Sequence, residues 1–384
     1  MRRPSDRIVA AALFTAFFAL YALTAQRGLG WGDSGEFQHW ILDGKNISAS
    51  EGFSNLHPLY LAVAGAFASS PYSVTLVSSL FGALAVTGFF FLSRNLAVSV
   101  LFGLAHAVWW LSCVAEVYTM SLAFIVFETY FLLKWRDSGR MGPLAALAAL
   151  NGLHLELHNI ALLALPVYAF VFFSRAKAEG WKTSCRKGAL AFAVWAVAAS
   201  YWIWALIMRG PADVLVGNYG AEVAGLLPAR WHVAVFNWAL AAMSFAPVAM
   251  LFLFSRRVKK DALLIALFAV HFVFWARYFI ISQFTFVLPS LFFAFLAVAA
   301  ANVRIRFALA VAAMELALPV AAYLTLSRVG FPSWYWSHPH RDDAAYFALP
   351  WKHNDDSADK CASEQSGPWD GYWHPERANG VIVK

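Results

Sequence analysis

Long apolar segments alternate with short polar ones along most of the chain. A helix of about 17–25 apolar residues is long enough to cross the hydrocarbon core of a bilayer. Most of the segments approach or reach this length with few charges, so we predict an all-α, polytopic transmembrane helical bundle. Its eleven predicted spans lie at 8–26, 73–93, 96–113, 115–133, 142–157, 159–174, 188–208, 233–254, 262–281, 284–302 and 307–326.

Two segments need a separate interpretation. Leu59–Ala68 is apolar but too short to cross a bilayer, so it is expected to lie at the interface or to re-enter. The first span could be a cleaved signal peptide, because small residues lie near its end. It is long, and Gln26-Arg27-Gly28 follows it without a clear cleavage motif, which favours an uncleaved anchor.

Composition excludes a soluble fold. Hydrophobic residues make up 61% of the chain and charged residues 13%, against about 45–50% and about 25% in soluble domains. The net charge of +7 comes from short basic clusters between the apolar segments, not from one basic surface, so nucleic acid is not an expected partner. The scattered Cys113, Cys185 and Cys361 form neither a zinc motif nor a disulfide framework.

The basic residues also orient the chain. With the N-terminus in the cytoplasm, the cytoplasmic segments hold 18 of the 29 Lys and Arg residues, as the positive-inside rule requires. We therefore expect a multi-pass protein of the cell inner (plasma) membrane with an extracytoplasmic C-terminus. Residues 1–326 form the predicted transmembrane domain, with a first outer loop at 27–58, and residues 327–384 form a short extracytoplasmic tail.

The first outer loop carries the first candidate chemistry. Asp33 and Glu36 are three residues apart and share one face if a helix begins near Ser34. Such a pair can provide a general base at the membrane surface. The alternative is structural: Asp33 as N-cap with Glu36 at N3 is typical of a capping box.

Further polar residues follow at the outer ends of later spans. Glu116 lies beside Tyr118, and an acid at this depth is usually paired or functional, although a simple interfacial Glu is the alternative. His154 and His158 have the i, i+4 spacing of metal ligands on a helix, but two histidines without a third ligand are weak evidence. Polar lining of a lipid-facing groove is the favoured interpretation, and plain polarity at a helix end is the alternative.

Arg209, Arg277 and Gln283 complete the set. A guanidinium binds phosphate oxygens in a bidentate manner, so either arginine is a candidate phosphate ligand, and snorkelling toward the interface is the alternative. The topology, which depends on apolar length and on the short basic loops, places all of the following on the outer side: Asp33, Glu36, His57, Glu116, His158, Arg209, Arg277 and Gln283.

Several of these residues belong to motifs that resemble a known family. Trp31-Gly-Asp-Ser-Gly-Glu36, Pro58-Leu-Tyr60 and Trp110…Glu116-Val-Tyr118 resemble the membrane family of domain of unknown function 2723, as do Gly152…His158 and Gln283-Phe-Thr-Phe. That family is related to protein O-mannosyltransferases, within the GT-C superfamily of polytopic glycosyltransferases. This chain departs from the family in having Phe53–His57 where His-Pro-Pro-Gly is usual.

The resemblance implies a function. Such enzymes move a hexose such as mannose, with inversion, from a polyprenyl-phosphate carrier to an extracytoplasmic protein or glycan acceptor. It implies that Asp33 is the catalytic base and that Glu36 assists it. The implied substrate-binding residues are His57, Tyr60, Glu116, Tyr118, His158, Arg209, Arg277 and Gln283.

The sequence leaves three points open. A transporter or flippase of a lipid-linked sugar would use the same outer groove without breaking a bond, although we find no internal repeat of the kind transporters often carry. An inactive scaffold subunit of a glycosylation complex is a further alternative. No cofactor is certain, but Asp33, Glu36 and Glu116 offer oxygen ligands suited to a divalent cation.

Overall fold

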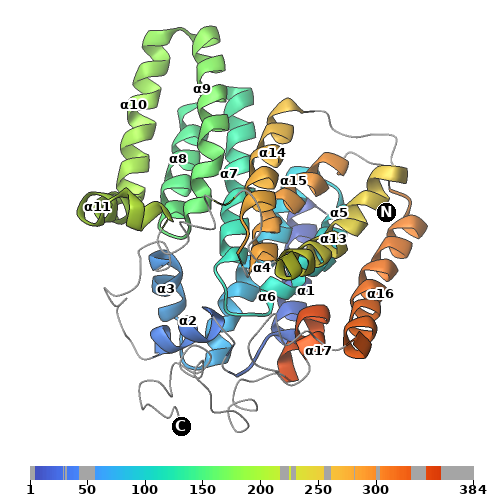
Figure 1. The fold of residues 1–384 in the computed structure, drawn as a ribbon. Coiled ribbons are helices and arrows are strands. Elements are labelled where there is room, and N and C mark those ends of the chain that lie inside the picture. Colours follow the sequence, from blue (N-terminus) through green and yellow to red (C-terminus); the bar gives the residue numbers. More distant parts are fainter. Residues whose placement is uncertain are drawn as a thin grey trace.

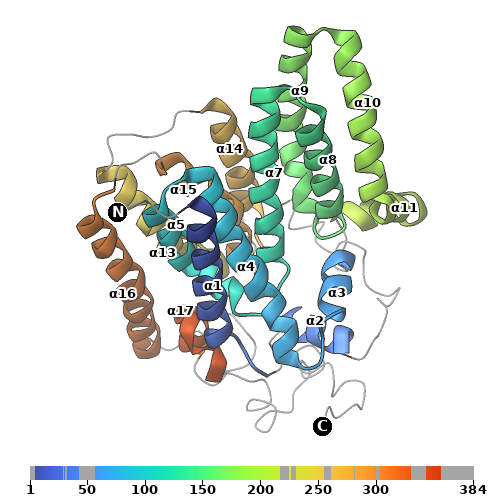
Figure 2. The same ribbon diagram turned by 180° about the vertical axis from the view of Figure 1, so that it is seen from behind.

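The computed structural model describes residues 5–28, 30, 33–42, 57–216, 225, 231–254, 261–280, 282–299, 303–329 and 343–355. Within these ranges the secondary structure is helical and contains no strand. The helices pack side by side into one bundle (Figures 1 and 2).

A row of five neighbouring helices forms one part of the bundle. It consists of α1 (Asp6–Thr24), α4 (Pro71–Ser93), α7 (Tyr118–Ser138), α8 (Met141–Leu155) and α10 (Trp181–Ala198), each packed against the next. Local sequence fixes the ends of these helices. A capping box between Ser70 and Ser73 starts α4, because it satisfies backbone N–H groups that the first turn leaves free. Gly139, with φ of 64°, ends α7.

The second part of the bundle packs against this row. It contains α13 (Trp231–Phe254), α14 (Ala262–Arg277), the 3₁₀ turn η5 (Gln283–Val287), α15 (Leu288–Val298) and α16 (Ile305–Val329). Aromatic rings fill the space where the two parts meet: the ring centroids of Phe89 and Phe102 lie 4.7 Å apart, and both rings contact Phe292 and Phe295. These four side chains are almost completely buried.

Most predicted spans correspond to helices, but two of them are broken. The segment 96–113 contains α5 (Leu96–Leu104) and α6 (His106–Ser112), which are separated at Ala105. The segment 188–208 covers the end of α10 and most of α11 (Ser200–Arg209), and the two helices are bent by 73° at the break. In the described part of the chain, five helices are long and apolar enough to cross a membrane, or six if that bent pair counts as one span. The total of eleven stays a prediction.

The two ends of the bundle differ in chemistry. At one end, Arg94 pairs with Asp6 at 2.6 Å and Arg136 pairs with Asp261 at 2.8 Å. The turn between α9 (Leu165–Glu179) and α10 projects from this end, which we call the basic end. The short helices α2 (Asp33–Leu42) and α3 (Pro58–Gly65) lie at the opposite end (Figures 1 and 2).

Part of the C-terminal region packs back onto the bundle against α16, α1 and α6, at the same end as α2 (Figures 1 and 2). It contains α17 (Asp343–Ala348) and the 3₁₀ turn η6 (Pro350–Asp355). Trp110 Nε1 of α6 donates a hydrogen bond of 2.8 Å to the carbonyl of Tyr346. His353 is fully buried beside the same ring. This segment is therefore a part of the bundle surface, and α16 extends to Val329, past the expected boundary at residue 326.

Candidate functional site

The start of α2 carries the motif residues Asp33, Ser34 and Gly35. Asp33 is the first helical residue and is half-buried. The helix thus begins next to the expected position, and the alternative of a capping box between Asp33 and Glu36 stays a prediction. Gly35 packs directly on the backbone of the preceding loop, since a Cβ there would lie 2.5 Å from the carbonyl oxygen of Gly30. Trp31, Gly32 and the side chain of Glu36 lie outside the described residues.

Glu116 joins α2 to the turn between α6 and α7. The hydroxyl of Ser34 donates a hydrogen bond of 3.2 Å to Glu116 Oε1. Ser78 of α4 holds the backbone of Glu116 from the other side, because its Oγ donates to the Glu116 carbonyl at 2.9 Å and accepts from the Glu116 N–H at 3.1 Å. The structure therefore brings two motifs together that are separated by more than 80 residues.

Gln38, which no sequence motif indicated, anchors α2. Its Oε1 accepts a hydrogen bond of 2.6 Å from the N–H of Gly30, and its Nε2 donates to the carbonyls of Gly28 and Pro71 and to Thr75 Oγ1. The side chain is completely buried. An amide that satisfies four partners at once fixes the loop before α2 against α4. The sequence indicates the role of Gln38 through its position alone, two residues after Glu36.

His57 begins the segment that returns from the first outer loop. It has a left-handed backbone with φ of 43°, and its Nδ1 donates to the carbonyl of Leu157 at 2.6 Å. The N–H of Leu59 donates to the carbonyl of Glu156 at 3.0 Å. These two bonds fasten α3 to the end of α8. Burial lowers the pKa of His57 to about 4, so the imidazole is neutral at neutral pH.

Aromatic rings at this end form a cluster between the outer loop and the bundle. The imidazoles of His57 and His158 stack with centroids 5.2 Å apart. His158 also contacts Tyr118 and Phe286, which contact each other. On the other side of His57 lies Phe37 of α2, at 5.6 Å. Burial, with a contribution from the nearby His57, lowers the pKa of His158.

Tyr60 lies behind this cluster. Its ring packs edge-on against Phe37 at 5.3 Å and is completely buried. Burial raises the pKa of the Tyr60 phenol, and the Glu116 carboxylate adds to the rise. Tyr60 is therefore close to Glu116 and to α2 but has no exposed surface of its own.

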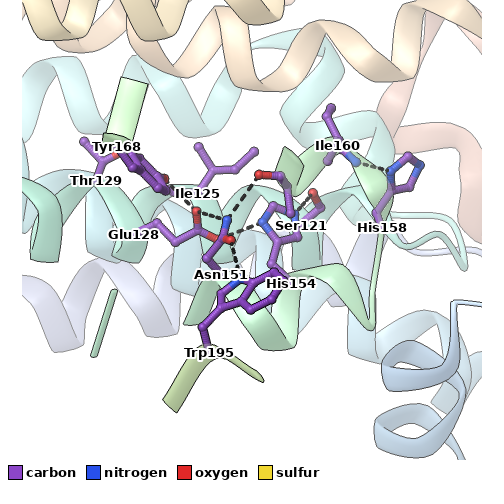
Figure 3. Close-up of polar contacts among 11 residues, drawn as sticks. Ser121, Ile125, Glu128, Thr129, Asn151, His154, His158, Ile160, Tyr168 and Trp195 are labelled. Carbon is purple, nitrogen blue, oxygen red and sulfur yellow. Dashed lines mark hydrogen bonds and ion pairs between the residues drawn. The ribbon is translucent and has the colours of Figure 1, made fainter. Parts of the chain in front are cut away.

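His154 and His158 do not form a ligand pair. Helix α8 ends at Leu155, so His158 lies beyond it and turns toward His57, whereas His154 points into the bundle (Figure 3). His154 Nδ1 lies 2.8 Å from Glu128 Oε1 and its Nε2 lies 2.6 Å from Ser121 Oγ. The expectation that both histidines share one helical face is wrong, because the helix stops before its next turn.

Glu128 is the centre of this buried network, which we call the Glu128 network. Its Oε2 accepts hydrogen bonds from Tyr168 Oη at 2.6 Å and from Asn151 Nδ2 at 3.3 Å (Figure 3). Asn151 Oδ1 also accepts a hydrogen bond from Trp195 Nε1, and Asn151 Nδ2 donates to the carbonyl of Ala161. Helices α7, α8, α9 and α10 all contribute. The position of Glu128 well inside the predicted span 115–133 was a signal, because buried membrane acids are usually paired or functional.

The later spans contribute three candidate site residues, Arg277, Arg209 and Gln283, and the surroundings of these side chains differ. Arg277 ends α14 with an exposed side chain, and its neighbour Tyr278 packs on Phe286 of the ring cluster. Arg209 pairs with Asp213 at 2.7 Å at the end of α11. Gln283 is completely buried and donates to the carbonyl of Trp275, so it holds η5 against α14. Of the three, Arg277 is linked most directly to the ring cluster, through Tyr278.

No metal site is evident in the described ranges. Among the residues described there, no group of three or more His, Cys, Asp or Glu side chains is arranged to hold a metal ion. Since the side chain of Glu36 is outside these ranges, the hypothesis of a divalent cation at Asp33, Glu36 and Glu116 stays a prediction.

Comparison with known proteins supports the fold. No family model matches the chain, and no curated protein matches its sequence. The structure is similar to that of ArnT from Cupriavidus metallidurans bound to undecaprenyl phosphate, with a TM-score of 0.57 and 16% identity over 90% of this chain and 75% of that chain. The predicted all-α, polytopic helical bundle is confirmed, and its fold is shared with that of ArnT. Membership in the narrower family of domain of unknown function 2723 stays a prediction.

Proposed function

We propose that this protein is a membrane glycosyltransferase that takes a sugar from a polyprenyl-phosphate carrier and transfers it to an acceptor at the outer face of the membrane. The observation that carries the proposal is the convergence at one end of the bundle. There, the helix that begins with Asp33 is tied to Glu116 through Ser34, beside the ring cluster of His57, His158 and Tyr118. The shared fold with ArnT, which was solved with undecaprenyl phosphate, supports the same class of donor.

The proposed reaction is a single displacement. The acceptor hydroxyl attacks the anomeric carbon, the bond from that carbon to the phosphate oxygen breaks, and the polyprenyl phosphate leaves. The acceptor proton passes to the Asp33 carboxylate, which acts as general base. Attack from the face opposite to the leaving phosphate inverts the configuration of the sugar. Glu36 would assist Asp33 as the second acid of the motif.

The other residues divide into groups by their surroundings. Arg277 is the better candidate for holding the carrier phosphate, because its guanidinium is exposed whereas Arg209 already pairs with Asp213. His57, His158 and Tyr118 offer neutral, aromatic surfaces on which a sugar ring can pack. Glu116 and Tyr60 support the start of α2. Gln283 acts indirectly, because it holds the turn between α14 and α15.

The finer details of the proposal follow from the sequence resemblance. The sugar is a hexose such as mannose, and the acceptor is a protein or a glycan. The basic loops at the end of the bundle opposite to α2 favour a cytoplasmic N-terminus and an outer face that carries the site. The protein would then act in the cell inner (plasma) membrane, on a substrate presented outside the cytoplasm.

The test is release of labelled sugar from the carrier in a single turnover. Purified protein in detergent is mixed with a radiolabelled polyprenyl-phosphate hexose and with solubilised membrane proteins and glycans as acceptors, for wild type, Asp33→Asn and Asp137→Asn. We expect Asp33→Asn to lower the rate by about 10²-fold or more, as removal of a general base does. Asp137 is an exposed carboxylate at the basic end, so Asp137→Asn is the matched control and is expected to keep the wild-type rate.

Three outcomes would contradict the proposal. Release by Asp33→Asn at the wild-type rate would refute the role of Asp33. Carrier binding without release in the wild type would favour the transporter, and no binding at all would favour a scaffold subunit.

A further inference from the structure

A groove lies between helices α7, α8, α9 and α10, on the side of the Glu128 network that faces the basic end. Its volume is about 440 Å³. Aromatic walls come from Trp135, Phe172 and Phe192, and the small side chains of Ala148, Ala169 and Ala191 leave the space between them. Ala169 is exposed, so the groove opens to the surroundings of the bundle.

The groove ends on polar residues that are already satisfied. Asn151, Tyr168 and Trp195 line its inner end. Asn151 and Tyr168 donate to Glu128, and Trp195 Nε1 donates to Asn151 Oδ1. These polar atoms are therefore committed to the protein, and the groove offers an almost purely apolar lining. Such a lining fits a hydrocarbon chain and disfavours a sugar or another polar ligand, which would lose hydrogen bonds there.

The length of the groove fits part of a lipid chain. On α8 it is lined from Leu144 to Asn151 and on α10 from Gly188 to Trp195. At a rise of 1.5 Å per residue this is about 10 Å, roughly a third of the hydrocarbon thickness of a bilayer. The groove thus runs along the bundle from the basic end toward its middle, in the direction a lipid chain takes in a leaflet.

The opening at the basic end is strongly cationic. Segments 134–140 and 175–187 contain eight basic and two acidic residues. Lys187 donates to the carbonyl of Gly139 at 2.7 Å and shares Glu179 with Arg175, so the turns of the two helix pairs are fastened together beside the groove. Arg140, Lys177, Lys182 and Arg186 are exposed and have no ion-pair partner among the described residues. This surplus of positive charge beside an apolar groove favours an anionic headgroup.

We propose that this groove is a binding site for an anionic diacyl phospholipid. One acyl chain lies between α8, α9 and α10, and the headgroup phosphate lies at the basic end beside Arg140 and Lys182, at the starts of α8 and α10. The choice of a phospholipid over the polyprenyl-phosphate carrier rests on the proposed function, whereas the apolar groove and its basic opening do not. A polyprenyl-phosphate carrier is not the expected occupant, because its phosphate would then lie at the basic end, away from Asp33.

The test compares lipids that differ only in headgroup. Native mass spectrometry of the detergent-solubilised protein is carried out with phosphatidylglycerol and with phosphatidylcholine of the same acyl chains. We expect phosphatidylglycerol to bind about 10-fold more tightly, from attraction to the basic residues. Ala169→Phe should fill the groove and weaken both lipids, whereas Arg140→Gln with Lys182→Gln should abolish only the preference for phosphatidylglycerol.

Controls separate the groove from general lipid contact. Val197→Phe adds similar bulk at an exposed position of α10 outside the groove, and Arg7→Gln removes an exposed charge on α1, so neither should change binding. Ala148→Leu replaces Ala169→Phe if the latter fails to fold. Equal binding of the two lipids, unchanged binding after the groove is filled, or displacement of phosphatidylglycerol by a lower concentration of polyprenyl phosphate would each overturn the proposal.

Discussion

The Ser34 hydroxyl donates a hydrogen bond of 3.2 Å to the carboxylate of Glu116, and this contact joins the first helix of the outer loop to the turn between α6 and α7. It connects the two sequence motifs that carry the candidate acids. Because Ser34 follows Asp33 directly, the contact also sets the position of the proposed base relative to the bundle.

Loss of this contact is expected to weaken catalysis. Ser34→Ala removes a hydrogen bond to a charged group, which contributes about 1.5–3 kcal/mol, and frees the start of α2. We expect kcat/KM for sugar transfer to fall by about 10-fold or more. Ser174→Ala is the control, since the Ser174 hydroxyl is exposed and bonds only within its own helix, to Phe170. Equal activity in the two variants would show that Ser34 does not position the site.

Among the residues of α2, Gln38 is expected to cause the largest loss of stability when a side chain of similar size replaces it. Gln38→Leu keeps a similar volume but removes the hydrogen-bond contacts of a buried amide, among them the acceptor for the Gly30 N–H. Each such loss costs about 1–3 kcal/mol, so thermal unfolding in detergent should occur at a clearly lower temperature. Gln38→Glu keeps the acceptor for Gly30 and loses the donors to Pro71 and Thr75. It should therefore also be destabilised, and a wild-type melting temperature in both variants would contradict this role.

Gly35 and Gly65 should respond oppositely to alanine. A Cβ at Gly35 would lie 2.5 Å from the Gly30 carbonyl oxygen, whereas a Cβ at Gly65 meets nothing within 4 Å. Gly35→Ala must therefore displace the loop before α2 and is expected to lower both stability and transfer activity. Gly65→Ala in α3 should be neutral or stabilising by up to about 1 kcal/mol, because alanine loses less backbone entropy. Thermal unfolding and labelled-sugar release of the two variants measure the contrast.

The Glu128 network predicts a graded effect on stability. Glu128→Ala leaves His154, Asn151 and Tyr168 without their shared acceptor and opens a cavity, and we expect a loss of about 3 kcal/mol or more. Tyr168→Phe removes only one of the three donors and should cost about 1.5–3 kcal/mol. Chemical unfolding in detergent gives both values, and a larger loss for Tyr168→Phe would place the centre of the network elsewhere.

The buried His57 is expected to make the folded protein less stable at acidic pH. Its pKa is near 6.5 in an unfolded chain and about 4 in the fold, because burial disfavours the charged ring. The unfolded state therefore binds more protons between these values, and stability present above pH 6.5 is lost as the pH falls toward 4. The shift corresponds to about 3 kcal/mol at most. His57→Asn keeps a donor for Leu157 and tolerates the left-handed backbone, so its melting temperature should fall less steeply over this pH range.

The length of the apolar segments and the positions of the short basic loops predict where several of the candidate residues lie. Glu116, Tyr118, His57 and His158 were expected at one end of the bundle, and their ring contacts and the Ser34–Glu116 bond place them there. Gln38 and Glu128 were not recognised, because their importance depends on partners that are distant in sequence. Arg209 and Arg277 could not be separated either, since only the fold shows that Arg209 already pairs with Asp213.

The sequence by itself determined the class of protein and the placement of most of its helices. Apolar length and basic loops act locally, through the cost of burying charges and unpaired backbone groups in lipid, so they can be interpreted along the chain. Only the tertiary structure decided where α8 stops, that 188–208 bends by 73°, and which polar side chains meet. These features depend on packing between helices, which brings distant residues together and cannot be deduced from local patterns.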